Sequence, residues 1–313
     1  MASKRNVTIA LTGGLGNQLF QLAAALSYAQ SETVQILTQQ GKPRKNVSGQ
    51  PELLSFSLPP NVRIINGGYF KWLSSKIIGF NLRSGFNPKK SELKLLPLIQ
   101  SISKVVLFAL TGHRWELAVA DNIGRPTKLR LERNTLLIGY FQTDAYIHEI
   151  GVENFVRGLA TRNPVVEEHR RLSELEQPLV VHVRLGDYKN ENSIGILRSE
   201  YYLENTKKLF SSGKYKRIWL FSDEPNEAIK LIEPDLLDEV RVIDSRDLSS
   251  AETLELMTFG KGYLIANSTF GWWGAYLSKS SDPDVTAPTP WFRKLPEPRE
   301  LVPQEWNRAN AFN

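Results

Sequence analysis

Residues 179–187 read Leu-Val-Val-His-Val-Arg-Leu-Gly-Asp, an apolar run rich in β-branched valine that predicts a buried strand. Because alternate residues of a strand share a face, His182 and Arg184 are expected to point the same way, about 6.6 Å apart along the strand. Gly186 and Asp187 then end the strand. Basic groups on a buried strand are costly unless an anion or another polar ligand completes them. The pattern therefore indicates a site for a phosphorylated ligand at the end of this strand.

The sequence after this strand alternates apolar runs with amphipathic segments. Strands that alternate with helices in this way indicate a parallel, doubly wound α/β sheet. The Pro-rich end from Pro283 to Pro303 is expected to be a tail that packs across the surface. The expected strands are Leu179–Leu185, Arg217–Phe221, Glu239–Ile243 and Gly262–Ala266, and the expected helices are Ser199–Phe210 with Ser199 as its cap, Asn226–Ile232, Ser250–Phe259 and Phe270–Ser278.

The N-terminal half shows the same alternation less regularly. The glycines of segment 13–16 lie between an expected strand and an expected helix, where phosphate-binding loops occur, but they form neither the dinucleotide fingerprint nor a P-loop. A linker is expected over Thr161–Pro178, where two X-Pro pairs interrupt the pattern. We therefore predict two α/β domains, 1–165 and 166–313. The expected strands of the first are Asn6–Thr12, Val34–Leu37, Asn61–Ile65 and Asn134–Tyr140, and its expected helices are Gln18–Gln30 and most of Glu92–Leu110.

The composition is that of an ordinary globular protein, with 41% hydrophobic and 23% charged residues in 313. The chain has no cysteine, which excludes disulfides, thiolate catalysis and cysteine-based zinc sites. Its four histidines do not have the spacing of metal ligands. Asp282-Pro283-Asp284 matches the Asp-x-Asp of metal-dependent sugar transferases, but it lies in the Pro-rich end and is interpreted as a loop. The sequence therefore predicts no metal site and no cofactor.

The net charge of +6 is unevenly distributed. Residues 1–150 contain 18 Lys and Arg against 8 Asp and Glu, a balance of +10, whereas residues 151–313 contain 21 against 25, a balance of −4. The basic excess is densest over Lys42–Lys94, which indicates either a solvated basic face or a surface that meets anionic lipid headgroups. No recognition module for nucleic acid accompanies the charge. We expect a cytoplasmic protein without a presequence, with peripheral contact at the inner face of a membrane and no nucleic-acid partner.

Polar residues follow the expected strands of the C-terminal half, and ligands of open α/β sheets bind beyond the carboxyl ends of the strands. Arg184 can donate two parallel hydrogen bonds to a pyrophosphate, and the helix that follows Asn267 can bind the same anion at its start. A carboxylate such as Asp223 can accept hydrogen bonds from guanine. Each feature taken singly has an ordinary structural interpretation: a His-x-Arg pair lies on the surface face of a strand, Ser-Thr at a helix start is a cap, and a carboxylate after a strand is a turn residue. Together they predict a site for a nucleoside diphosphate, formed by His182, Arg184, Asp187, Ser222, Asp223, Asn267, Ser268 and Thr269.

Five segments of the chain stand out as motifs: Gly13-Gly14-Leu15-Gly16-Asn17-Gln18-Leu19-Phe20-Gln21, Gly139-Tyr140-Phe141-Gln142 followed by Tyr146, His182-Val183-Arg184-Leu185-Gly186-Asp187-Tyr188, Phe221-Ser222-Asp223, and Asn267-Ser268-Thr269-Phe270-Gly271-Trp272-Trp273-Gly274-Ala275. Together they resemble glycosyltransferase family 11, the α-1,2-fucosyltransferases, within the wider superfamily of α-1,2-, α-1,6- and protein O-fucosyltransferases. The motifs span nearly the whole chain, and the last is the most specific. Two positions depart from the family pattern: Leu185 stands where many relatives carry a second Arg, and Gly271 stands where Ser is common.

The resemblance implies a GT-B architecture of two Rossmann-like domains that face a cleft, with the N-terminal domain on the acceptor side and the C-terminal domain binding the sugar nucleotide. It implies an inverting, metal-independent transfer of L-fucose from GDP-β-L-fucose. The acceptor would be O2 of a terminal galactose in an oligosaccharide or a lipid-linked glycan, and the product an α-1,2-fucoside. Breaking the sugar–phosphate bond leaves negative charge on the diphosphate, so the main catalytic effect is expected to be electrostatic.

The resemblance also implies roles for individual residues. Arg184 would bind the β-phosphate and stabilise the departing GDP, while His182 and Asp223 would contact guanine. The remaining donor-binding residues would be Gly14, Gly16 and Asn17 in the N-terminal glycine loop, Ser222, Asn267, and, on the diphosphate, Ser268 and Thr269.

A general base can take the proton of the acceptor hydroxyl, and Asp187 ranks before His182 for this role. An equally weighted alternative is that Asp187 only caps the loop that holds Arg184. Three other functions stay open: a non-catalytic nucleotide- or carbohydrate-binding protein, a GDP-sugar transferase of different linkage, and a peripheral nucleic-acid-binding protein that uses the basic half.

Overall fold

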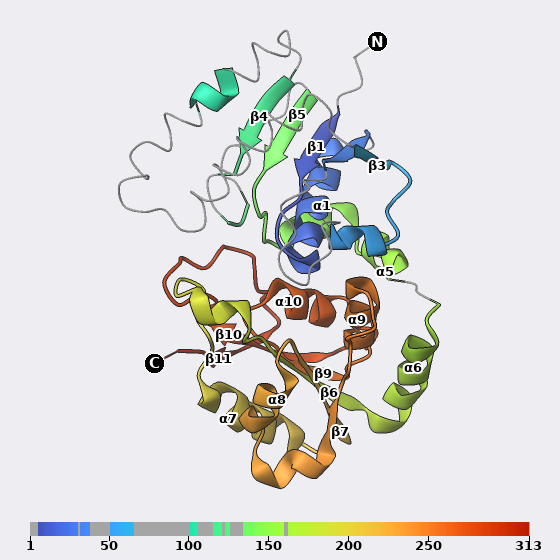
Figure 1. Cartoon of the computed structure of the whole chain (residues 1–313), viewed down its shortest axis with the longest axis vertical. Coiled ribbons are helices and arrows are strands. Elements are labelled where there is room, and N and C mark those ends of the chain that lie inside the picture. The colour runs from blue at the N-terminus through green and yellow to red at the C-terminus, as the bar shows by residue number, and fades with distance from the viewer. Residues whose placement is uncertain are drawn as a thin grey trace. The chain divides into compact units, whose positions relative to one another are not determined.

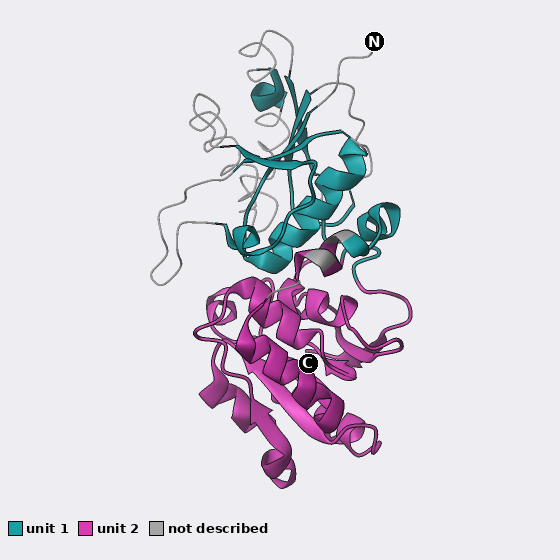
Figure 2. Cartoon of the chain, turned by 90° about the vertical axis from the view of Figure 1, so that its right-hand side faces the viewer, with its two compact units in different colours: residues 1–154, 298–301 teal, residues 155–297, 302–313 magenta. Residues whose placement is uncertain are grey.

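The computed structural model describes residues 6–30, 32–37, 51–65, 101–105, 115–120, 123–125, 134–159 and 162–312. The chain forms two compact units, drawn in teal and magenta in Figure 2. Unit 1 comprises Met1–Asn154 and Pro298–Leu301, and unit 2 comprises Phe155–Glu297 and Val302–Asn313. The sequence placed the division between residues 165 and 166; in the structure it falls earlier, and a short C-terminal piece belongs to unit 1.

The described part of unit 1 contains a parallel five-stranded sheet with the order β3-β2-β1-β5-β4 (Figure 1). Its central strand β1 is buried at every residue. The strand order reverses between β1 and β5, so the loops that leave these two strands meet at the carboxyl edge of the sheet. The elements are β1 (Val7–Ala10), α1 (Leu15–Ala29), β2 (Val34–Leu37), β3 (Val62–Ile65), β4 (Trp115–Val119), β5 (Asn134–Ile138), α4 (Ala145–Ile150) and α5 (Glu153–Gly158), with a short 3-10 turn at Glu52–Ser55.

The described part of unit 2 contains a parallel six-stranded sheet with the order β11-β10-β9-β6-β7-β8. Counted from β6 as the first strand, this is the 3-2-1-4-5-6 order of the doubly wound dinucleotide-binding fold. Its strands are β6 (Pro178–Val183), β7 (Arg217–Ser222), β8 (Val240–Val242), β9 (Gly262–Leu264), β10 (Asp284–Thr289) and β11 (Asn307–Asn310). Its helices are α6 (Pro164–Glu176), α7 (Ser199–Phe210), α8 (Pro225–Ala228), α9 (Ser250–Met257) and α10 (Thr269–Tyr276), with 3-10 turns at Asp187–Asn190, Ile229–Leu231 and Pro234–Glu239.

The predicted α/β class with two doubly wound parallel sheets is confirmed, and the eight strands expected from the sequence are found, with ends shifted by a few residues. That the two domains face one another across a cleft stays a prediction. Of the expected helix Glu92–Leu110, residues 101–105 are helical and the rest lies outside the described residues, as does most of the basic stretch Lys42–Lys94. Strand β4 was not predicted.

Two predictions about the C-terminal half are wrong. The expected linker Thr161–Pro178 contains helix α6, which begins where Asn163 accepts a hydrogen bond from the amide of Val165 and Pro164 occupies the first turn. The Pro-rich end is not a surface tail, because it contains the inner strand β10, paired with both β9 and β11.

The prediction that Ser199 caps helix α7 is also wrong. Arg198 is the residue before the first turn and makes no side-chain cap, and Ser199 is already helical.

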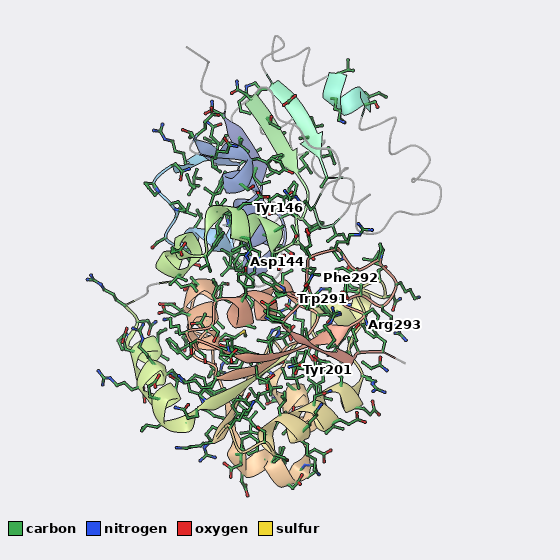
Figure 3. The ribbon with its side chains drawn as sticks, turned by 180° about the vertical axis from the view of Figure 1, so that it is seen from behind. Asp144, Tyr146, Tyr201, Trp291, Phe292 and Arg293 are labelled. Atoms are coloured by element: carbon green, nitrogen blue, oxygen red, sulfur yellow. The ribbon has the colours of Figure 1, made fainter. Side chains whose placement is uncertain are left out.

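The core of unit 2 fixes the ends of the two central strands. All six residues of β6 are buried, as expected for a parallel strand covered on both faces. Val181 and Val183 pack in one cluster with Tyr201 of α7, which is labelled in Figure 3. The Tyr201 hydroxyl donates a hydrogen bond to the carbonyl of Ile265, just past β9, at 2.7 Å.

Across the described residues, no helix combines the length and apolar character needed to cross a bilayer.

Candidate functional site

The segments that follow β6 and β9 carry five of the eight site residues predicted in the C-terminal half. These strands are neighbours in the sheet, and the strand order reverses between them. In an open α/β sheet the ligand binds at such a reversal, beyond the carboxyl ends of the strands. The topology of unit 2 therefore selects residues 184–188 after β6 and 267–269 after β9 as the candidate site.

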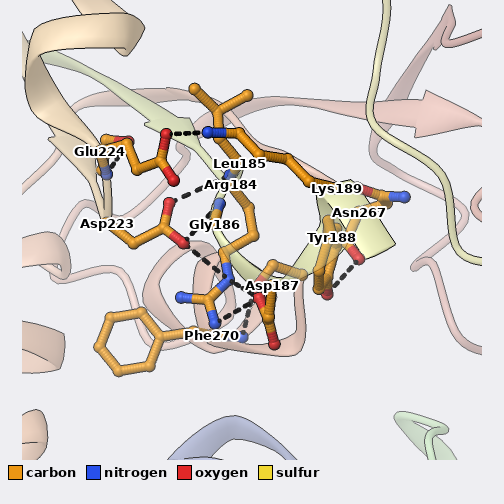
Figure 4. A network of polar contacts seen from close by, with 12 residues as sticks. Arg184, Leu185, Gly186, Asp187, Tyr188, Lys189, Asp223, Glu224, Asn267 and Phe270 are labelled. Atoms are coloured by element: carbon orange, nitrogen blue, oxygen red, sulfur yellow. Dashed lines mark hydrogen bonds and ion pairs between the residues drawn. The ribbon is translucent and has the colours of Figure 1, made fainter. Parts of the chain in front are cut away.

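Arg184 lies one residue beyond the end of β6, between two carboxylates (Figure 4). Its Nε donates a hydrogen bond to Oδ1 of Asp187 at 3.1 Å, and its Nη2 lies 2.9 Å from the same oxygen. Oδ2 of Asp223 lies 3.4 Å from Nε. Burial lowers the pKa of Arg184, but the two carboxylates outweigh this effect, so the pKa is raised and the guanidinium stays charged. Within the described residues, Nη1 has no hydrogen-bond partner. Arg184 is thus a fixed cation with one edge open.

Asp223 holds the loop that carries this cation. Its Oδ1 accepts a hydrogen bond from the amide of Leu185, and its Oδ2 accepts one from the amide of Gly186, both at 3.0 Å. A Cβ on Gly186 would lie 2.5 Å from Oδ2, so the close approach of the carboxylate requires glycine at this position. A contact of Asp223 with guanine stays a prediction, and it would use the lone pairs that these amides leave.

Tyr188 connects the two loops of the site. Its hydroxyl donates a hydrogen bond to the carbonyl of Asn267 at 3.3 Å. The guanidinium carbon of Arg184 lies 5.7 Å from the centre of the Tyr188 ring, a cation–π distance. Burial raises the pKa of Tyr188 to about 12, so the hydroxyl stays protonated. Tyr188 stands in one of the sequence motifs but was not among the predicted site residues; its position after the strand-end Arg is the signal that could have found it.

His182 lies against helix α10. It is only 5% exposed, and a Cβ on Gly271 would overlap its Nδ1. This Nδ1 is buried without a hydrogen-bond partner among the described residues. Burial, assisted by the Arg184 cation, lowers the pKa of His182 to about 4 against the opposing effect of Asp223. The imidazole is therefore neutral near pH 7, and Arg184 supplies the positive charge at this strand end.

Helix α10 begins at the second loop of the site. The hydroxyl of Ser268 caps the helix by accepting a hydrogen bond from the amide of Phe270 at 3.3 Å, and Thr269 is the first helical residue. Asn267 donates from Nδ2 to the carbonyls of residues 194 and 195, at 3.3 and 3.0 Å. Its Oδ1 is buried without a partner in the part of the chain that the structure describes. The positive end of the α10 dipole thus lies beside the loop that Tyr188 joins to Arg184.

Ser222 has a local role. It ends β7, and its hydroxyl accepts a hydrogen bond from the amide of Glu224 at 3.0 Å. Glu224 in turn pairs with Lys189, as Figure 4 shows. The structure therefore places Ser222 beside the site residue Asp223 as a turn residue.

In unit 1, two of the sequence motifs are joined at the reversal between β1 and β5. Nε2 of Gln21 donates to the carbonyl of Gly139 at 2.8 Å, and Nε2 of Gln142 donates to Oδ1 of Asn17 at 2.9 Å. The bonded residues are 118 and 125 positions apart in the chain. The first and middle motifs therefore form one structural feature, and Asn17 is part of it.

The glycine loop opens helix α1 with Gly14 as its cap residue, and Gly16 is buried in the first turn. The amide of Leu15 donates a hydrogen bond to Oε2 of Glu52 at 3.0 Å. A carboxylate of the protein thus already occupies part of the helix end where a phosphate would bind. The donor-binding roles of Gly14, Gly16 and Asn17 stay predictions, and a phosphate at this end would meet the charge of Glu52.

The structure thus brings one part of the predicted site together within unit 2. Arg184, Asp187 and Asp223 form one network, and Tyr188 connects it to the loop of Asn267 and Ser268. Gly14, Gly16 and Asn17 belong to the other unit. Among the described residues, no group of three or more metal-ligating side chains is arranged to hold an ion.

Comparisons with known proteins extend this description. The family model described as glycosyl transferase family 11 matches residues 117–307 of the chain. An alpha-1,2-colitosyltransferase of Escherichia coli is 26% identical, with 96% of this chain and 98% of that protein covered. The O-antigen biosynthesis glycosyltransferase WbnK, also of Escherichia coli, is 25% identical over 90% of this chain and 93% of its own. Among solved structures, the fucosyltransferase NodZ from Bradyrhizobium matches 88% of this chain and 94% of its own, with 16% identity and a TM-score of 0.48.

Proposed function

This chain belongs to glycosyl transferase family 11, and we propose that it transfers L-fucose from GDP-β-L-fucose, with inversion, to O2 of a terminal galactose in a glycan. That it is a glycosyltransferase follows from the family and from the two curated relatives, whose similarity covers almost the whole chain. The donor, the acceptor and the linkage are the proposal.

The observation that carries the proposal is the charged Arg184 at the strand-order reversal of unit 2. Its guanidinium is held by Asp187 and Asp223 and lies over the ring of Tyr188, whose hydroxyl reaches the start of α10. A cation and a helix N-terminus that meet at this point form a suitable site for the diphosphate of a sugar nucleotide. His182, neutral and buried, would offer ring nitrogens for hydrogen bonds rather than charge.

The proposed reaction needs its negative charge stabilised on the leaving group. As the bond between the sugar and the diphosphate breaks, charge grows on the phosphate oxygens, and a preorganised guanidinium binds that charge more strongly than it binds the ground state. Asp223 and Tyr188 hold Arg184 before the donor arrives, so little reorganisation is needed during the step. An acceptor hydroxyl that attacks from the opposite face then inverts the anomeric carbon, and Asp187 is the first candidate to take its proton.

One finding favours a second donor. The name of one relative is alpha-1,2-colitosyltransferase, which shares the proposed linkage but not the proposed sugar. Transfer of colitose from a GDP-linked donor is therefore the second candidate function, served by the same diphosphate site.

A donor and acceptor screen tests the proposal. The purified chain is incubated with GDP-fucose, GDP-colitose or UDP-galactose and with galactose-terminated oligosaccharides, and the products are identified by mass spectrometry and linkage analysis. We expect an α-1,2-linked product from a GDP-linked donor and none from UDP-galactose. Binding of GDP without transfer to any acceptor would favour a non-catalytic binding protein, and transfer from UDP-galactose alone would contradict the proposed nucleotide.

The same assay tests the proposed independence from metal ions. With EDTA in excess, turnover should be unchanged, because Arg184 and the α10 start are proposed to neutralise the diphosphate. Loss of turnover with EDTA, restored by Mn²⁺ or Mg²⁺, would contradict this part of the proposal.

A further inference from the structure

The two carboxylates beside Arg184 are held in different ways. Asp223 is fixed, because each of its oxygens accepts a backbone hydrogen bond and its side chain is 22% exposed. Asp187 is 54% exposed, and its hydrogen bond and ion pair within the described residues are both with Arg184. Asp187 lies at the first position of the short 3-10 turn Asp187–Asn190. Of the two, only Asp187 can leave the cation without breaking other contacts.

Asp187 occupies one of the two guanidinium edges through which Arg184 can bind phosphate, and a diphosphate, which has two phosphates, can take both edges. A guanidinium binds a phosphate most strongly through two parallel N–H groups, and Nε with Nη2 is one such pair. Oδ1 of Asp187 lies 3.1 Å from Nε and 2.9 Å from Nη2, so it binds this pair. A phosphate oxygen can take the same place only when the carboxylate moves away. Asp187 and a phosphorylated ligand therefore compete for one edge of one cation.

We propose that the Asp187 carboxylate pairs with the Arg184 guanidinium in the ligand-free protein and is displaced from it by the diphosphate of the donor. The inference rests on the function proposed above and adds how its site exchanges one anion for another. The displaced carboxylate releases the guanidinium and turns towards solvent, where water replaces its hydrogen bonds at small cost and where it stays available as the base proposed above. Asp223 and the Tyr188 ring keep the guanidinium in place during the exchange. Because the ion pair between Asp187 and Arg184 must be broken first, the affinity for the diphosphate is lower than a free Arg184 would give.

The test is a titration of the full chain and its variants with GDP, inorganic pyrophosphate and guanosine by isothermal calorimetry. Asp187→Asn removes the competing charge and keeps the size of the side chain, and Asp187→Ala removes the side chain. Asp244→Asn is the matched control, because Asp244 is 57% exposed and pairs with Arg246 in its own loop after β8. It removes the same charge without freeing Arg184.

We expect both Asp187 variants to bind GDP and pyrophosphate about 1.5- to 5-fold more tightly, the range that loss of one exposed ion pair allows. Guanosine binding should stay unchanged in them, and Asp244→Asn should bind all three probes as the parent does. Unchanged or weaker binding of both phosphorylated probes by Asp187→Asn and Asp187→Ala, with an unchanged melting temperature, would overturn the inference while leaving the proposed function intact. A parent protein that binds neither GDP nor pyrophosphate would overturn the proposed function and this inference together.

Discussion

The hydroxyl of Tyr188 lies 3.3 Å from the carbonyl oxygen of Asn267, and this hydrogen bond joins the two loops that flank the strand-order reversal of unit 2. The Tyr188 ring at the same time faces the guanidinium of Arg184. One side chain therefore ties the cation of the site to the loop that opens helix α10. The relationship explains why a tyrosine follows the strand-end Arg-x-Gly-Asp sequence.

Tyr188→Phe tests this connection. The variant keeps the ring under Arg184 and loses one hydrogen bond, which contributes about 0.5–1.5 kcal/mol, so we expect the Kd for GDP to rise roughly three- to tenfold. Calorimetric titration measures the change. Tyr215→Phe is the control, because Tyr215 packs against Gly262 at the opposite ends of β7 and β9 and its hydroxyl has no partner in the described structure. Equal losses in both variants would show that the Tyr188 hydroxyl has no special role.

Gly271 is expected to be required by the imidazole of His182. A methyl group at this position would overlap Nδ1, so Gly271→Ala should lower the free energy of unfolding by about 1–3 kcal/mol. Urea unfolding of the single variants and of the double variant with His182→Ala measures the coupling. Removing the imidazole should recover most of the Gly271→Ala cost. Strictly additive effects would contradict the contact.

His182 should also make the fold sensitive to mild acid. Its pKa is lowered from 6.5 to about 4 by burial and by the Arg184 cation, so between these values the unfolded chain binds a proton that the folded chain does not. The contribution of His182 to stability is therefore complete above pH 6.5 and is lost as the pH falls towards 4, with a slope of about 1.4 kcal/mol per pH unit.

Urea unfolding between pH 4 and pH 7 measures this slope. His182→Gln should flatten it, whereas His148→Gln should not, because the His148 side chain is 70% exposed. The same slope in the parent and in His182→Gln would rule out the neutral, buried histidine as its source.

The strands of both sheets could be predicted because buried parallel strands are apolar along their whole length, as Leu179–Val183 illustrates. Helix α6 and strand β10 were not predicted, because each contains proline. Pro164 suggested a linker but occupies the first turn of α6, where its missing N–H costs nothing, and Asn163 before it is the cap that signals a helix. The prolines between Pro283 and Pro303 suggested a surface tail, yet Pro288 lies within β10, which pairs on both sides.

The sequence could predict which residues gather at the strand ends, since parallel strands present their carboxyl ends at one edge. It could not predict what they bind within the protein. Asp223 was expected to contact guanine, which stays a prediction, but that its carboxylate also accepts hydrogen bonds from two backbone amides of the loop after β6 could not be predicted. Glu52 was not expected near the glycine loop, because it is 37 residues away from Leu15 in the sequence and no pattern of residues indicates the contact. Contacts of this kind depend on tertiary packing.

The most direct test of the account is single-turnover transfer from GDP-fucose by Arg184→Ala, measured with EDTA present beside the parent and Arg246→Ala. Arg246 is 87% exposed and pairs with Asp244, so its variant controls for the loss of one surface guanidinium. We expect Arg184→Ala to keep the circular dichroism and melting temperature of the parent. Its rate should fall at least about 10²-fold, the scale for removing a main donor to a developing anion, whereas Arg246→Ala should transfer at the parental rate. A folded Arg184→Ala variant that transfers fucose within a few-fold of the parental rate would contradict the account.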